Sequence, residues 1–397
     1  MSRLHVSPAF LVGLTFLVSV SERVVAASTY SSQDILFKLF DQTGGLSWTS
    51  SKDWLSDEIC TYEGVVCYDD DESDIRRVGH VQEIDLSGHD LSGHLPPELY
   101  NLPFLKALDL SRNPKLVVSF QGLANAGYLE YFDFSQTSTM FLEGLEVAVD
   151  SLKELYMSDL VIDGPIPDSI YELVNLEVLV ANTNGFTGSI SSDISSFFSL
   201  RVLALNDNDL ESSLPTQIGN LLNLQTLDLS NNRLGGSLPS DAIDRLVDLR
   251  ILDLSQDDTG VNIDSGFTGS LPNFANSRDL VSVNLRNQQI GGMIPESFLQ
   301  SAPSNKPLTV DLSNNLLTGG IPTGLSEKRR LDLLLADNRI SSIDTSLCSQ
   351  VPEWLGGDVS ASGSCNGFLC PSQFYSPDEG RQTRDQVCLP CLASFVG

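Results

Sequence analysis

The chain has 397 residues and carries 52 acidic against 23 basic side chains, which gives a formal net charge of −29 at pH 7. A field of this sign repels nucleic acid and anionic lipid, so it argues against both as partners. Hydrophobic residues make up 41% of the chain, which is enough for a continuous core.

Residues 1–27 have the pattern of a secretory signal peptide. Arg3 supplies a positive charge, an apolar run follows over residues 9–20, and small residues precede a cleavage point before Ser28. The run is shorter than the ~20 residues that span a bilayer. We therefore expect a secreted, extracellular chain, in the cell wall or at the cell surface. An uncleaved signal anchor is the alternative.

Residues 28–80 come before any repeat and are expected to form an N-terminal cap. Ser32 or Asp34 is expected to cap a helix, because apolar residues with helical spacing follow at Ile35, Leu36, Leu39 and Phe40. Cys60 and Cys67 are close enough in sequence for a disulfide to close a small loop. The acidic run at residues 69–74 lacks the ligand spacing of a calcium site and is expected to be a solvated loop.

A repeat with the lettering LxxLxLxxNxLxGxLP, clearest at residues 224–239, recurs over residues 81–345. The alternation in LxL predicts a short strand with its leucines turned inward, and stacked units then form a parallel sheet along one face. Eleven units are counted by the second apolar residue of the LxL core: Leu86, Leu110, Phe134, Met157, Ala181, Leu205, Leu229, Leu254, Leu285, Leu312 and Leu335.

An asparagine stands three residues after six of these core residues, at Asn113, Asn184, Asn208, Asn232, Asn315 and Asn338. Its amide is expected to satisfy backbone groups inside the stack. Gln288 is expected to replace it in part, whereas Thr137 is expected to do so less well. We interpret these residues as structural.

The lettering resembles the plant-type leucine-rich repeat, LxxLxxLxLxxNxLxGxIPxx, over about two thirds of the chain. The resemblance implies an α/β solenoid, a right-handed superhelix with a parallel concave sheet, about eleven repeats and disulfide-stapled caps. It also implies a second, short sheet at the LxGxIP stretch. After Leu110 and Phe134 these letters are missing, so the convex side there is expected to be irregular or helical. Residues 28–80 resemble the family's N-terminal cap, with Tyr62 in place of a tryptophan.

The chain ends in a second group of cysteines. Residues 346–369 are expected to form a C-terminal cap, and residues 370–397 resemble one ephrin-receptor-like cysteine-rich motif. Six cysteines are expected in disulfides: Cys60, Cys67, Cys348, Cys365, Cys370 and Cys388. Cys391 is left unpaired, which indicates a free thiol, an intermolecular disulfide or a truncated longer protein. A membrane partner is expected only for a truncated receptor or an uncleaved anchor.

The sequence contains no catalytic motif and no motif for a cofactor or a metal. The histidines beyond the signal are His80, His89 and His94, all at the cap or the first repeat. We therefore expect a protein that is not an enzyme, with function on the outward strand positions and on an inserted loop near residues 257–264.

Most outward positions just before the second core residue are aspartates, but the middle repeats break this pattern. There an aromatic and apolar patch is expected to bind a ligand, at Tyr131, Tyr156, Val178, Val180, Val202 and Ala204. The expected function is non-catalytic recognition of a protein, a peptide or a cell-surface glycan on the concave face. One alternative is an inhibitor of an extracellular hydrolase that resembles the polygalacturonase-inhibiting proteins. Another is a structural wall or matrix protein cross-linked through Cys391.

Overall fold

The computed structural model describes residues 30–148, 151–257, 266–342, 347, 374–375 and 389–390. The predicted signal peptide, the inserted loop beyond Asp257 and the five C-terminal cysteines lie outside the described residues. The two-residue strands β24 (Phe374–Tyr375) and β25 (Leu389–Pro390) form an antiparallel pair. None of the helices among the described residues is long and apolar enough to cross a membrane.

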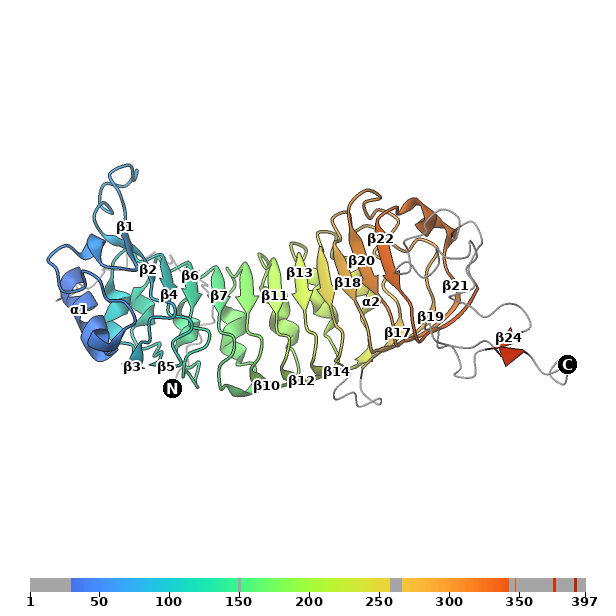
Figure 1. Ribbon diagram of the computed structural model, residues 1–397, viewed down its shortest axis with the longest axis horizontal. Coiled ribbons are helices and arrows are strands. Elements are labelled where there is room, and N and C mark those ends of the chain that lie inside the picture. The colour runs from blue at the N-terminus through green and yellow to red at the C-terminus, as the bar shows by residue number, and fades with distance from the viewer. Residues whose placement is uncertain are drawn as a thin grey trace, which may run out of the picture.

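One twelve-stranded sheet runs the length of the molecule, from blue β1 to orange β22 in Figure 1. The eleven repeat strands pair in parallel, and β1 of the cap pairs antiparallel with β2. Their order is β1 (Val65–Cys67), β2 (Val81–Asp85), β4 (Ala107–Asp109), β6 (Tyr131–Asp133), β7 (Glu154–Tyr156), β9 (Val178–Val180), β11 (Val202–Ala204), β13 (Thr226–Asp228), β16 (Ile251–Asp253), β18 (Ser282–Asn284), β20 (Leu308–Asp311) and β22 (Leu331–Leu334). This confirms the solenoid predicted from the repeat, with its parallel concave sheet.

The predicted second sheet is present in three separate pieces. The first joins β3 (Ser92–His94) and β5 (Lys115–Val117), and the second joins β8 (Asp163–Pro165), β10 (Gly185–Gly188), β12 (Asp209–Ser212) and β14 (Arg233–Leu234). The third joins β15 (Gly236–Ser237), β17 (Phe267–Ser270), β19 (Gln289–Met293), β21 (Leu316–Gly320) and β23 (Arg339–Ser342). The first break falls in the repeat of Phe134, where the Gly and Ile-Pro letters are missing. The same letters are missing after Leu110, yet β5 forms there, so the expected irregular convex side is wrong for that repeat.

The helical segments that connect the strands of the solenoid are short. The α-helices of the described residues are α1 (Ser32–Gln42) and α2 (Ser240–Ile243). The other helical segments are 3-10 turns: η1 (Gly45–Ser47), η2 (Ile59–Thr61), η3 (Pro97–Asn101), η4 (Leu123–Asn125), η5 (Leu145–Ala148), η6 (Asp168–Glu172), η7 (Ser192–Ser196), η8 (Thr216–Asn220) and η9 (Thr323–Glu327). Repeats of about 24 residues leave room between their strands for little more than one such turn.

The core is one continuous apolar column inside the stack. In β13 the inward Leu227 is 0% exposed, and Leu229 just after the strand is 2% exposed. The outward Thr226 and Asp228 are half-buried. This alternation is the expected consequence of a strand whose side chains point to opposite faces. It leaves two outward positions per strand on the concave face.

In most repeats a side-chain amide connects the repeat to the one before it. Asn232 Nδ2 donates to the backbone oxygens of Leu205 and Leu229, at 2.9 and 3.0 Å. Its Oδ1 accepts from the backbone N–H of Leu210 at 3.0 Å. Gln288 makes the equivalent pair of contacts, as predicted, with the oxygen of Leu254 and the N–H of Phe267, both at 2.7 Å.

The backbone groups near Thr137 have more hydrogen-bond partners than we expected. Thr137 Oγ1 donates to the backbone oxygen of Phe134 at 2.9 Å and lies 2.8 Å from Thr139 Oγ1. Thr139 Oγ1 in turn accepts from the backbone N–H of Val118 at 3.0 Å. Two short hydroxyl side chains therefore span the distance that one asparagine side chain spans elsewhere.

The N-terminal cap closes one end of the column. The helix cap is Ser31 and not Ser32 or Asp34, because Ser31 and Asp34 form a reciprocal capping box. Trp54 is 1% exposed, and its ring lies 5.0 Å from that of Tyr62 and 4.8 Å from that of Trp48. The structure also joins Cys60 and Cys67 in a disulfide, with their Cα atoms 5.6 Å apart.

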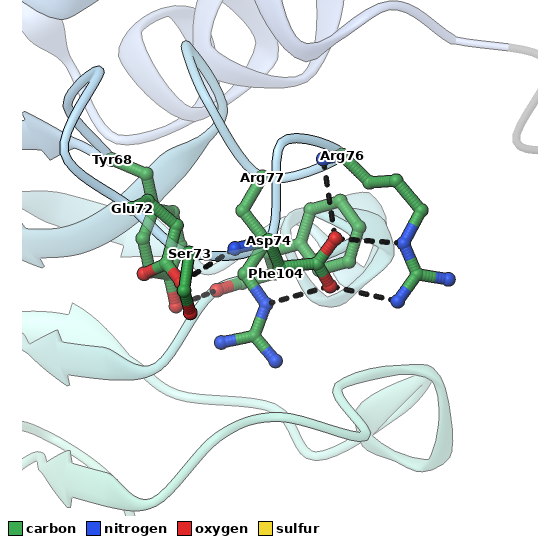
Figure 2. A network of polar contacts seen from close by, with 7 residues as sticks. All are labelled: Tyr68, Glu72, Ser73, Asp74, Arg76, Arg77 and Phe104. Atoms are coloured by element: carbon green, nitrogen blue, oxygen red, sulfur yellow. Dashed lines mark hydrogen bonds and ion pairs between the residues drawn. The ribbon is translucent and has the colours of Figure 1, made fainter.

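The acidic run at residues 69–74 is a largely exposed loop, as expected, in which Glu72 and Asp74 are half-buried. The Asp74 carboxylate accepts from Arg76 Nε at 2.8 Å and Nη2 at 2.7 Å, as Figure 2 shows. These hydrogen bonds lower the pKa of Asp74 to about 2. Arg77 Nε also lies 3.6 Å from Asp74, and its guanidinium lies 5.9 Å from the centre of the Phe104 ring. Asp74 and Arg77 thus hold this loop against the first repeats.

Candidate ligand-binding surface

The six predicted patch residues come together on four neighbouring strands, β6, β7, β9 and β11. Their backbone positions form two rows because the parallel strands pair in register. In the first row Val178 and Val202 stand side by side, and Tyr131 lies two strands away from Val178. In the second row Tyr156 is followed by Val180 and Ala204. All six side chains are half-buried.

The two tyrosines form the aromatic end of the patch. Their ring centres are 5.3 Å apart and the ring planes are tilted by 41°. Burial raises the pKa of Tyr156 to about 12, and it raises the pKa of Tyr131 as well. Both phenols are therefore protonated at neutral pH. They offer flat apolar area together with a hydroxyl, a combination that is frequent at binding sites.

Sequence reasoning missed one residue in the middle of this surface. Glu154 pairs with Tyr131 on one side and with Val178 on the other, so it interrupts the first row. Its Oε2 accepts a hydrogen bond from the Tyr156 hydroxyl at 3.1 Å. The signal was present in the register, since Glu154 precedes Tyr156 by two positions and must point to the same face.

Acidic residues flank the patch at both ends of the second row. Asp133 on β6 pairs with Tyr156, and Asp228 on β13 pairs with Ala204. Burial raises the pKa of both carboxyl groups, and hydrogen bonds from Ser135 and Ser230, which lower it, offset this effect only in part. The row continues with Asp109 beyond Asp133, and with an aspartate on β16 beyond Asp228.

Basic side chains lie along the edge where the strands begin, and glutamates pair with several of them. Glu130 lies 3.6 Å from Lys106 and 3.0 Å from Lys153. Glu177 lies 3.4 Å from Arg201. These positive charges are therefore largely compensated within the protein. The acidic second row keeps the concave face negative on both sides of the patch.

The helical side of the solenoid carries an open cavity of about 660 Å³. It is lined by Asp168, Tyr171, Glu172, Asp193, Ser195, Ser196, Phe198 and Asn220. This set contains no histidine, cysteine or basic group. Within the described part of the chain, no three His, Cys, Asp or Glu residues are grouped closely enough to hold a metal ion.

Comparison with known proteins places this architecture among leucine-rich repeats. The leucine rich repeat family model matches residues 198–258. A leucine-rich repeat receptor-like serine/threonine-protein kinase of Arabidopsis thaliana is 33% identical over 106 residues, which are 26% of this chain and 10% of that protein. This chain therefore matches only a small part of that relative.

Solved structures share the fold over most of the chain. The leucine-rich repeat ectodomain of the Arabidopsis receptor kinase HAESA, bound to an IDA peptide hormone, superposes with a TM-score of 0.60 and 22% identity. The alignment covers 81% of this chain and 55% of that one. A plant ice-binding protein gives a TM-score of 0.62 and 22% identity, over 78% of this chain and 95% of that one. The chain thus folds as a leucine-rich repeat solenoid of the kind found in plant receptor ectodomains.

Proposed function

We propose that the chain is an extracellular, non-catalytic recognition module that binds a peptide, or an extended segment of a protein, on its concave face. The observation that carries the proposal is the patch of six half-buried aromatic and apolar side chains on four adjacent strands. Such a patch with polar borders is typical of an interaction site. Among the similar structures, HAESA holds a peptide hormone within the same fold.

The chemistry of the patch favours a peptide over a glycan. Val178, Val180, Val202 and Ala204 offer only methyl groups, which cannot hydrogen-bond to sugar hydroxyls. Covering them with apolar side chains of a peptide contributes about 25 cal/mol per Å² removed from water. Tyr131 and Tyr156 add hydroxyl groups for a peptide backbone. The extracellular location is supported by the signal pattern of residues 1–27 and by the receptor ectodomains that share the fold.

The proposal is tested by selecting a displayed library of random decapeptides on the full chain. We expect an enriched set of peptides that bind the native protein. Val180→Asp should weaken their binding at least tenfold, because a charge buried at the centre of an apolar contact costs more than about 1.4 kcal/mol. Binding is measured by calorimetry with individual synthetic peptides.

The matched control is Val161→Asp, which introduces the same charge at a valine that is 69% exposed and lies outside the strands of the large sheet. We expect this variant to bind the peptides as the native chain does. Both variants should keep the native melting temperature within a few degrees. If the selected peptides bind Val180→Asp as tightly as the native chain, the concave patch is not the binding surface.

A further inference from the structure

The charged residues at the border of the patch restrict the kind of ligand that it can bind. Asp133 and Asp228 stand in the same row as Tyr156, Val180 and Ala204, one at each end. The row therefore reads as an acidic residue, three aromatic or apolar residues, and an acidic residue. A ligand that covers the three central side chains must also meet both carboxylates.

Neither carboxylate is neutralised within the described part of the protein. Asp133 Oδ1 accepts from the backbone N–H of Ser135 at 2.8 Å. Asp228 Oδ1 accepts from the N–H and the Oγ of Ser230, at 3.1 and 2.7 Å. These bonds orient the two side chains but supply no positive charge. Asp109 lies beside Asp133 in the row and adds a negative charge there, which acts on Asp133 more strongly than the positive charge of Arg112.

Three basic side chains that precede the strands of the patch are already paired. Lys106 and Lys153 share Glu130, and Arg201 pairs with Glu177. The half-buried carboxylates of the row thus form no close ion pair within the described residues, although their surroundings are less polar than water, and only the more distant Arg112 favours the charged form of Asp133. A cationic group from outside would gain more at these positions than at a fully exposed carboxylate.

The distance between the two carboxylates sets the spacing of their partners. Asp133 and Asp228 are separated by four strand-to-strand steps, from β6 through β7, β9 and β11 to β13. Neighbouring strands lie about 4.8 Å apart, which gives roughly 19 Å. An extended peptide that runs across the strands advances about 3.3 Å per residue. It covers this distance in about six residues.

We infer that the ligand is a peptide segment with two basic side chains about six positions apart and apolar residues between them. One basic side chain meets Asp133, the other meets Asp228, and the apolar residues cover Tyr156, Val180 and Ala204. This inference depends on the proposed function, because it assigns the chemistry of the peptide that the patch binds.

The experiment repeats the decapeptide selection on the native chain and on Asp133→Asn/Asp228→Asn. Asparagine keeps an oxygen that can accept the Ser135 and Ser230 hydrogen bonds, so the fold should be retained. We expect the native pool to be enriched in pairs of Lys or Arg five to seven positions apart with apolar residues between them. The pool from the double variant should keep the apolar residues and lose the spaced pair.

Individual peptides from the native pool give a second measurement. They should bind the double variant about tenfold more weakly, the scale of two half-exposed ion pairs. Raising the salt concentration should weaken their binding to the native chain and should have little effect on the double variant. The control is Asp168→Asn/Asp241→Asn, which removes two charges from the helical segments η6 and α2. It should bind the peptides as the native chain does.

The outcomes separate the two proposals. If the native pool binds through Val180 but shows no spaced basic pair, or if the double variant selects the same pair, the charge inference is wrong and the recognition function stands. If no peptide distinguishes the native chain from Val180→Asp, both proposals fall.

Discussion

Single buried amides hold neighbouring repeats together. Asn113 is 0% exposed, and its Nδ2 donates to the backbone oxygens of Leu86 and Leu110, at 2.8 and 2.9 Å. Its Oδ1 accepts from the backbone N–H of Leu91 at 2.9 Å. All these groups lie away from water, so each depends on this one side chain for a partner.

We therefore predict that Asn113→Ala lowers the free energy of unfolding by about 3 kcal/mol. Buried donors and acceptors that lose their partner each cost about 1–3 kcal/mol, and no water replaces the amide without a new cavity. The shift in urea midpoint measures the effect. Asn125→Ala is the control, because Asn125 is exposed and donates to Asn101. A loss equal to that of the control would contradict the structural role of Asn113.

At the scale of elements, the repeat of Phe134 is the one that departs most from the pattern. It has no strand in the second sheet, where β5 and β8 belong to separate pieces. Its hydroxyl pair, Thr137 and Thr139, is 5% and 1% exposed and replaces the asparagine of the other repeats. The pair also connects to the preceding repeat through the N–H of Val118.

Thr139→Val is predicted to destabilise the protein by about 1–3 kcal/mol. Valine has nearly the same shape as threonine, so the change leaves packing intact and removes the acceptor for the Val118 N–H together with the hydrogen bond to Thr137 Oγ1. Unfolding in urea gives the magnitude. Thr216→Val is a matched change at an exposed threonine of η8 and should be close to neutral. Equal stability of the two variants would show that the hydroxyl pair does not hold the irregular repeat.

The repeat lettering predicted the elements of the solenoid because a sequence period of about 24 residues corresponds to one structural unit that recurs along the chain. Each LxL core became a strand, and the fold followed from stacking. The Thr137–Thr139 pair was not predictable, since two separate hydroxyls have no fixed spacing that marks them as one group. Ser31 was missed as the helix cap because Ser32 and Asp34 satisfy the same residue preference.

The patch was only partly predictable for a related reason. The repeat does not fix the residue types at the outward positions. The sequence therefore shows which outward residues are apolar, but their neighbours on the adjacent strands are known only once the register of the strands is known. Glu154 was overlooked because the patch was predicted from apolar character alone, and Glu154 is a charged residue that lies between two members of the patch. The register places Glu154 between Tyr131 and Val178, and it places Asp133 and Asp228 at the ends of the second row.

At the scale of the whole molecule, charge is spread along an elongated stack. Figure 1 shows the repeats stacked one after another, so that each strand of the large sheet lies beside strands of the adjacent repeats only. The net charge of −29 is therefore distributed over a long surface. Self-repulsion of this kind opposes folding and weakens in salt or acid.

Two groups of carboxylates respond to pH with opposite sign. Burial raises the pKa of Asp133, Asp228 and Asp244, so the folded chain binds these protons more readily than the unfolded chain. Their ionisation costs stability at neutral pH, and that stability returns as the pH falls toward the raised values. Hydrogen bonds lower the pKa of Asp74 and Glu98, from Arg76 and Lys38 respectively. The stability from this second group is lost as the pH falls below the ordinary carboxyl values.

We predict that the urea midpoint rises as the pH falls from neutral toward the raised pKa values of Asp133, Asp228 and Asp244, and then falls below about pH 4, the range of ordinary carboxyl pKa values. A series at 0.5 M salt screens the self-repulsion and leaves mainly the effect of burial. In that series Asp133→Asn/Asp228→Asn should show a smaller rise than the native chain as the pH falls from neutral toward about 4, because two of the three raised groups are gone. A midpoint that declines steadily from pH 7 downward would show that the buried carboxylates do not control the stability of this face.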